Sequence, residues 1–234
     1  MLIKKYLSRI LPKISIRKVV AISCIVLAIL LLVLTLYKTD YFTIYSNDYS
    51  SIEREYDWYI PQGYDHNCTV FSGLMAAKWA GHSINRTAAD LREEFSPDIT
   101  EGGWFPGILS RFLNSYDINH RIKYIITKNK LINQLSNGNI VIIHINPTFI
   151  ARSNDEESDY GLYYEPFFTN HVVVVKGYKT GDDGKIYFEV YDPWYSDLTN
   201  TDGSYKGKNR YYLSDELIKA VNVNRYVVVL NPKS

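Results

Sequence analysis

Residues 171–192 read HVVVVKGYKTGDDGKIYFEVYD, a pattern typical of two strands joined by a short polar turn. A turn at residues 179–184 places His171 directly opposite Asp192, at the end of the hairpin. In this register one face is apolar except at that end, and the other face carries the charges. Opposed side chains in a sheet have Cβ atoms roughly 4.5 to 5.5 Å apart. The sequence therefore predicts that the Asp192 carboxylate orients the imidazole of His171 and stabilises its protonated form.

Cys68 is the nucleophile on which such a histidine could act. It begins the stretch CTVFSGLMAAKWA, residues 68–80, which is typical of a helix and has Asn67 or Asp65 available as cap. A thiol at a helix N-terminus and beside a histidine is favoured as thiolate. Six residues upstream, Gln62 could donate from its amide to a developing oxyanion, together with the backbone N–H of Cys68. Nucleophile, base, orienting carboxylate and oxyanion donor are the parts that thiol-dependent acyl transfer needs.

Each of the four side chains also has a common structural explanation. Cys68 alone could be a small buried hydrophobe, and Gln62 a surface residue. His171 could be structural at the start of a strand, and Asp192 before Pro193 could open a turn. Their order, spacing and hairpin register together favour the catalytic interpretation.

Three further residues are predicted to bind substrate: Trp104, His66 and Asn170. We expect substrate to enter near Trp104 and the loop at 147–170, whose acidic run at 155–159 is either a selector of basic segments or a solvated loop tip. The remaining histidines are weaker candidates: His82 follows a helix end, His120 lies in a charged linker, and His144 faces either solvent or the core.

The rest of the body changes from helical patterns to strand patterns along the chain. Helices are predicted at 68–80, 87–94, 105–115 and 128–135, and strands at 140–145, 171–178, 185–192 and 225–230. This order predicts an α+β fold, in which a helical half packs on an antiparallel sheet.

The N-terminal segment differs from the body in charge and hydropathy. Residues 1–39 hold seven basic and no acidic residues, and residues 19–37 carry no charge. At nineteen residues the apolar run is longer than the core of a cleavable signal peptide, and we interpret it as one transmembrane helix, an uncleaved signal anchor, rather than a buried core helix. The predicted parts are a basic cytoplasmic tail at 1–18, the anchor in the lipid bilayer at 19–37, a spacer at 38–57 and a domain at 58–234. The positive-inside rule places that domain outside the cell, on a single-pass cell-membrane protein.

Charge and cysteine content exclude some classes of protein. The formal net charge is +1, so after the seven basic residues of the first 39 the body holds 19 basic and 25 acidic residues, or −6. An acidic body is a poor nucleic-acid binder. Of the two cysteines, Cys24 lies in the apolar segment and Cys68 in the body, so the body cannot form an internal disulfide. No cofactor and no metal site is predicted.

Several segments resemble papain-like cysteine peptidases, specifically the bacteriocin-processing (double-glycine leader) peptidase-like family, cysteine peptidase family thirty-nine. They are IPQGYDHNCTVFSGLM at 60–75, where Gln62, Asn67, Cys68, Ser72 and Met75 match, LINQLSNGNIVIIHI at 131–145, NHVVVVKGY at 170–178 and YDPW at 191–194. The resemblance covers roughly residues 58–196. It implies a papain-like fold, Cys68 as nucleophile, His171 as base and acid, Asp192 as orienting residue and Gln62 as oxyanion donor. Thr69-Val70 departs from the Gly-Pro of many members, and we expect these bulkier residues to narrow the non-prime side of the site.

The leading hypothesis is thus a membrane-anchored, outward-facing cysteine peptidase that acts on a peptide or protein. Two alternatives stay open: a thiol acyltransferase or amidase acting on cell-wall peptides, and a catalytically idle papain-like binding module with an unknown secretion or cell-wall partner.

Overall fold

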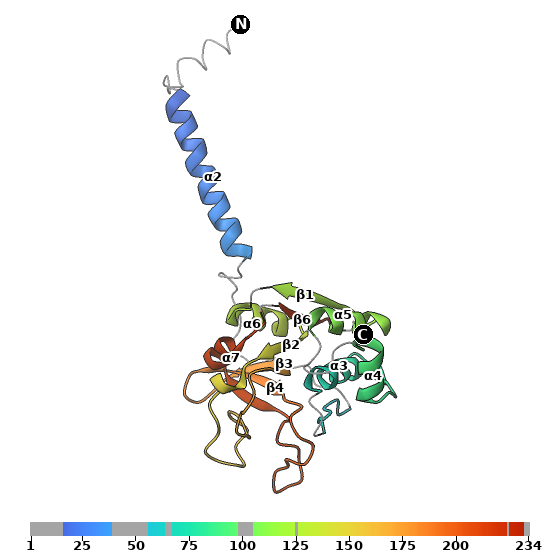
Figure 1. Cartoon of the computed structure of the whole chain (residues 1–234). Helices are drawn as coiled ribbons and strands as arrows, with labels where there is room; N and C mark the ends of the chain where they lie inside the picture. The colour runs from blue at the N-terminus through green and yellow to red at the C-terminus, as the bar shows by residue number, and fades with distance from the viewer. Residues whose placement is uncertain are drawn as a thin grey trace. The chain divides into compact units, whose positions relative to one another are not determined.

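The chain divides into two units, residues 1–43 and 44–234, which are considered separately. The computed structural model describes residues 16–38, 56–63, 67–97, 105–124, 126–223 and 225–231 (Figure 1). The predicted basic tail lies outside these residues except for its last three positions, and the spacer lies outside them except at its two ends, residues 38 and 56–57.

The first unit contains helix α2, Ile16–Lys38, which includes the apolar segment. Its apolar side chains at 19–33 are exposed, with Val19 at 49% and Leu27 at 59%. Among the residues described, no helix combines the length and the apolar character that crossing a bilayer requires. The predicted transmembrane helix at 19–37 is therefore not confirmed.

The second unit is an α+β fold with an antiparallel sheet, as predicted. The sheet has six strands, of which four were predicted. The strand order is β1-β6-β2-β3-β4-β5. In chain order the elements are α3 Cys68–Trp79, α4 Ala88–Phe95, α5 Pro106–Ser115, β1 His120–Tyr124, α6 Lys128–Ser136, β2 Ile140–Ile145, the 3₁₀ turn η1 Pro147–Phe149, β3 His171–Thr180, β4 Ile186–Tyr191, β5 Arg210–Leu213, α7 Ser214–Ala220 and β6 Arg225–Val229.

Helices cover both faces of this sheet, and each face has its own core. The helices α3, α4 and α5 gather at one side and α6 and α7 at the other (Figure 1). On β2, Ile140 and Ile142 join the core of α3 and α5, whereas Val141 and Ile143 join the core of α6 and α7. A strand that is buried on both faces has no solvent-exposed polar face, which explains why residues 140–145 are apolar apart from the buried His144.

The four predicted helices of the body are confirmed, and local sequence explains most of their ends. Thr87 caps α4 through a capping box with Asp90. Gly81 has φ 90° just beyond α3, a conformation that favours glycine. Asn67 occupies the N-cap position of α3 but does not cap it, because its Oδ1 accepts a 2.7 Å hydrogen bond from Arg92 Nη1.

Other predictions were wrong in detail. His120 lies in β1, not in a linker, and neither β5 nor α7 was predicted. In the hairpin β3–β4, Val175 pairs with Val190, two positions from the predicted register, and a bulge follows before Gly177. The turn spans residues 181–185 rather than 179–184, because β3 continues to Thr180 and β4 begins only at Ile186.

Candidate active site

Cys68 is the first residue of α3, the helix that packs most closely on β3. Ten of the twelve residues of α3 are buried, which accounts for its nearly continuous run of apolar and small residues. The Ser72 hydroxyl donates a 3.2 Å hydrogen bond to the Val172 carbonyl, which links the first turns of α3 to β3. This packing holds Cys68, which is 9% exposed, beside the first residue of β3. Cys68 also lies at the N-terminus of α3, the positive end of the helix dipole.

His171 opens β3 and meets Asp192 immediately after β4. His171 Nε2 and Asp192 Oδ1 are 2.7 Å apart, and both side chains are buried. The prediction that the two residues are direct cross-strand partners was wrong. His171 pairs with Ile145 of β2, and Asp192 reaches the ring from beyond the end of β4. Because Nε2 faces Asp192, Nδ1 is the ring nitrogen left for Cys68, whose thiol interacts with the imidazole.

The electrostatics of this trio favour a charged imidazole. Burial acts to lower the pKa of His171, but the Asp192 carboxylate and the interaction with Cys68 outweigh it and raise the pKa to about 10. Burial likewise acts to raise the pKa of Asp192, and the neighbouring His171 charge with several hydrogen bonds brings it below its usual value. Both shifts have the sign expected of a buried imidazolium–carboxylate pair.

Tyrosines from separate segments surround Asp192, and sequence reasoning missed them all. The hydroxyls of Tyr212 and Tyr164 donate to Asp192 Oδ2 over 2.6 and 3.3 Å, and the Trp194 N–H donates to Oδ1 over 3.0 Å. Burial and the Asp192 charge raise the pKa of both tyrosines well above 10, so they remain donors. No local pattern marks these residues, because they come from a loop and from strand β5, which the sequence did not reveal.

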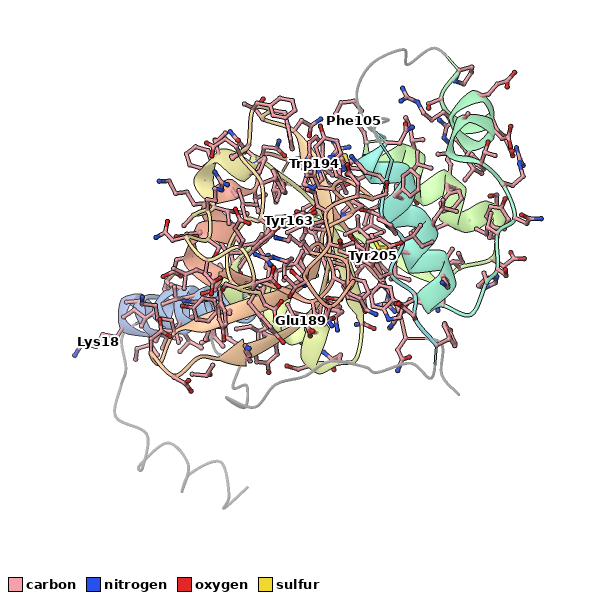
Figure 2. All side chains as sticks on the ribbon, turned by 90° about the horizontal axis from the view of Figure 1, so that it is seen from below. Lys18, Phe105, Tyr163, Glu189, Trp194 and Tyr205 are labelled. Carbon is pink, nitrogen blue, oxygen red and sulfur yellow. The ribbon has the colours of Figure 1, made fainter. Side chains whose placement is uncertain are left out.

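The backbone carbonyl and N–H of Asp192 are hydrogen-bonded as well as its side chain. Its carbonyl accepts a 2.7 Å hydrogen bond from the Tyr59 hydroxyl, and its N–H donates to the Gly207 carbonyl over 2.8 Å. The Tyr163 hydroxyl donates to the Trp194 carbonyl over 2.7 Å, and Figure 2 labels both residues. The short segment after β4 is thus fixed on several sides.

Gln62 lies beside that segment. Its N–H donates to the Pro193 carbonyl over 2.6 Å, and its side chain is 1% exposed. Its Oε1 has no hydrogen-bond partner among the described residues, so no hydrogen bond to that oxygen fixes the orientation of the side-chain amide. The oxyanion role of Gln62 stays a prediction.

The predicted substrate-binding residues have different outcomes. Trp104 and His66 lie outside the described residues. Asn170 is exposed next to His171, and the Asn222 Nδ2 donates to its Oδ1 over 3.5 Å. Among the described residues there is no cluster of three or more side chains able to hold a metal ion.

His144 belongs to the core rather than to solvent, with 2% of its surface exposed. Burial and the charge of His171 lower its pKa to about 4. The Asn170 side chain approaches the ring and opposes this shift, although the ring nitrogens have no partner at hydrogen-bond geometry among the described residues. His144 is therefore neutral and unsuited to replace His171 as the charged partner of a thiolate.

A model of the Peptidase_C39-like family matches residues 59–219, a range that contains Cys68, His171, Asp192 and Gln62. The chain belongs to the Peptidase_C39-like family. Among solved structures it is similar to a Bacillus anthracis protein classed as a C39-like peptidase, with 16% identity, a TM-score of 0.52, and coverage of 80% of this chain and 100% of that one. It also matches the ragweed pollen cysteine protease Amb a 11 in its proform, with 13% identity, a TM-score of 0.44, and coverage of 70% and 58%. No curated protein matches the sequence.

Membership of the Peptidase_C39-like family identifies a peptidase-like protein. The Thr69-Val70 departure is accommodated in α3, where both residues are buried. Thr69 Oγ1 has no hydrogen-bond partner within the described part of the chain. The predicted narrowing of the non-prime side by these residues stays a prediction.

Proposed function

We propose that the chain is a cysteine peptidase that hydrolyses a peptide or amide bond with Cys68 as nucleophile. The observation that carries the proposal is the buried contact of 2.7 Å between His171 and Asp192, with the other ring nitrogen left for Cys68. A thiolate, an imidazolium and a carboxylate in this order match the requirements of acyl transfer through a thioester.

In the proposed reaction the Cys68 sulfur attacks the carbonyl carbon of the substrate. The S–C bond forms, the C–N bond breaks, and the proton on His171 passes to the leaving amine. Water then attacks the thioester while His171 takes one of its protons, and Cys68 is released. Asp192 keeps the imidazole oriented throughout, and Gln62 with the Cys68 N–H is proposed to bind the oxyanion.

The test compares the full-length protein in mild detergent with its Cys68→Ala and His171→Ala variants. Each is incubated with a peptide library of known sequences and with a cell-wall digest, and the products are identified by mass spectrometry. We expect cleavage by the wild type and none above background by the two variants. His120→Ala is the matched control, because it removes a histidine on β1, whose ring contacts Ser110 and Ile118. Cleavage that persists in Cys68→Ala, or that is absent in the wild type, would refute the proposal.

We further propose that the N-terminal segment anchors the protein in the cell membrane with the peptidase domain outside. The uncharged sequence at 19–37 and the exposed apolar side chains at 19–33 of α2 support this proposal. Exposed apolar surface of this extent favours lipid over water. The six basic residues before position 19 favour a cytoplasmic N-terminus.

Fractionation and protease protection test the anchoring. We expect the protein in the membrane fraction after washing with high salt and alkali, and we expect protease added to intact cells to digest the domain. A variant with Leu27 and Leu31 both changed to Arg should shift to the soluble fraction. Release of the wild type by the washes, or protection of the domain in intact cells, would contradict the proposal.

A further inference from the structure

A group of aromatic side chains begins at the His171 ring and ends in solvent. Phe168 and Trp194 contact the imidazole, with ring centroids 5.5 and 5.8 Å from it, and lie 4.3 Å from each other. Phe167 packs on both of them, at 5.2 Å from Phe168 and 5.9 Å from Trp194. We call Phe167, Phe168 and Trp194 the aromatic wall. Because Trp194 is buried, the wall is exposed to water through Phe167 and the partly exposed Phe168.

Phe167 is the most exposed large hydrophobic side chain that the structure describes, at 71%. Single exposed apolar residues are common on protein surfaces and need no explanation by themselves. Phe167 differs from them because it continues an apolar surface that touches the catalytic imidazole. It is also well exposed, so its removal leaves no buried cavity.

The chemistry decides which part of a substrate meets this surface. In acyl transfer from an amide the leaving nitrogen must receive the proton of His171, and the scissile nitrogen therefore approaches the imidazole. The residue attached to that nitrogen, the first on the amine side of the bond, extends over the histidine side of the site. That side is where Phe168, Trp194 and Phe167 lie.

We propose that Phe167 selects substrates with a large apolar residue immediately after the scissile bond. This inference rests on the proposed peptidase function and adds a substrate class to it. Binding such a side chain removes apolar surface of Phe167 and of the substrate from water, whereas a small or charged side chain gains nothing there. Discrimination between apolar and polar residues by one such contact is about tenfold in kcat/KM.

The experiment measures cleavage positions in a peptide library of known sequences with the full-length wild type, Phe167→Ala, Tyr124→Ala and Cys68→Ala. Tyr124 is the matched control, because it is an aromatic residue of similar exposure, 60%, on the edge strand β1. We expect the wild type to favour Leu, Ile, Phe or Met over Ser, Gly or Asp after the bond by about tenfold, and Phe167→Ala to lose most of that preference. Tyr124→Ala should keep it. Labelling of Cys68 by iodoacetamide should proceed at the same rate in wild type and Phe167→Ala, showing that the trio is intact.

The outcomes separate this inference from the proposed function. Cys68-dependent cleavage without an apolar preference after the bond, or with a preference that Phe167→Ala retains, overturns the inference and leaves the peptidase proposal standing. A Phe167-dependent preference on the acyl side of the bond also overturns it, since the aromatic wall would then contact the other half of the substrate. Absence of any Cys68-dependent cleavage refutes the peptidase proposal and this inference with it.

Discussion

The Tyr212→Phe substitution tests how a fully buried carboxylate remains charged beside the candidate nucleophile. Asp192 is 0% exposed, and the hydroxyl of Tyr212, itself 0% exposed, donates to its Oδ2 over 2.6 Å. The substitution removes this hydroxyl and preserves the ring that packs in the core. A hydrogen bond to a charged group contributes about 1.5–3 kcal/mol, so we expect the free energy of unfolding at pH 7 to fall by about that amount.

The sign of the pH dependence follows from the pKa of Asp192. That pKa lies below the usual value in the folded protein, so its contribution to stability is present above the unfolded pKa and is lost as pH falls through the folded pKa. Loss of the Tyr212 hydroxyl should raise the folded pKa by roughly one to two units. The variant therefore begins to protonate Asp192 at a higher pH than the wild type does. Below that pH the stability difference between the two proteins should narrow.

Urea unfolding of both proteins at pH values from 8 down to 4 measures these differences. Tyr163→Phe is the control, because its hydroxyl donates to the neutral carbonyls of Trp194 and Asp192, over 2.7 and 3.5 Å, and not to the carboxylate. We expect it to lose about 0.5–1.5 kcal/mol at every pH. An equal, pH-independent loss in both variants would refute the argument that Tyr212 stabilises the charge of Asp192.

Three further predictions concern the surroundings of the site. Gly207→Ala should destabilise the protein by about 3 kcal/mol or more in urea unfolding, because the added Cβ would overlap the Asp192 carbonyl oxygen. Gly63→Ala should change the stability little, because no described atom lies within 4 Å of the position that its Cβ would take. The folded pKa of His171, about 10, lies above its unfolded value. Protonation of His171 therefore stabilises the folded protein fully below about pH 6.5, and this stabilisation is lost as the pH rises toward 10. Over this pH window the wild type should lose more free energy of unfolding than Asp192→Asn does, as measured by urea unfolding. Arg210 donates four hydrogen bonds to carbonyls of the loop at 158–161. Arg210→Lys should therefore lower the free energy of unfolding by about 2–4 kcal/mol and accelerate proteolysis in that loop. An unchanged cleavage rate would show that the loop keeps its conformation without the guanidinium.

The predictable part of the fold is the part encoded by neighbouring residues. Helix α6 and the turn that follows it at Gly138, with φ 76°, agree with local periodicity and turn chemistry, as does the capped start of α4 at Thr87. Strand β2 was predicted at its exact bounds because an apolar run between turn signals marks a strand buried on both faces. Strand β1, HRIKY, carries charges because it is an edge strand paired only with β6, so its sequence resembles a linker.

The contact between His171 and Asp192 was predicted from a register that is wrong by two residues. Side chains alternate between faces with a period of two, so the shift of two positions at the His171 end, where Val175 pairs with Val190, leaves the residues there on their predicted face. Beyond the bulge, where Gly177 pairs with Glu189, the shift is three positions. His171 and Asp192 therefore remain on one face at one end of the sheet. The Asp192 side chain reaches the His171 ring diagonally and not from the directly opposite position that was expected. A shift of one residue would have separated them. For His171 and Asp192 the sequence thus determines the face but not the register, and their 2.7 Å contact depends mainly on the face. The face alone does not supply the other hydrogen bonds to the carboxylate. Tyr164 and Tyr212 are distant in sequence and meet Asp192 only after the sheet has formed, and the Tyr212 hydrogen bond adds to the effect of the His171 charge in lowering the pKa of Asp192.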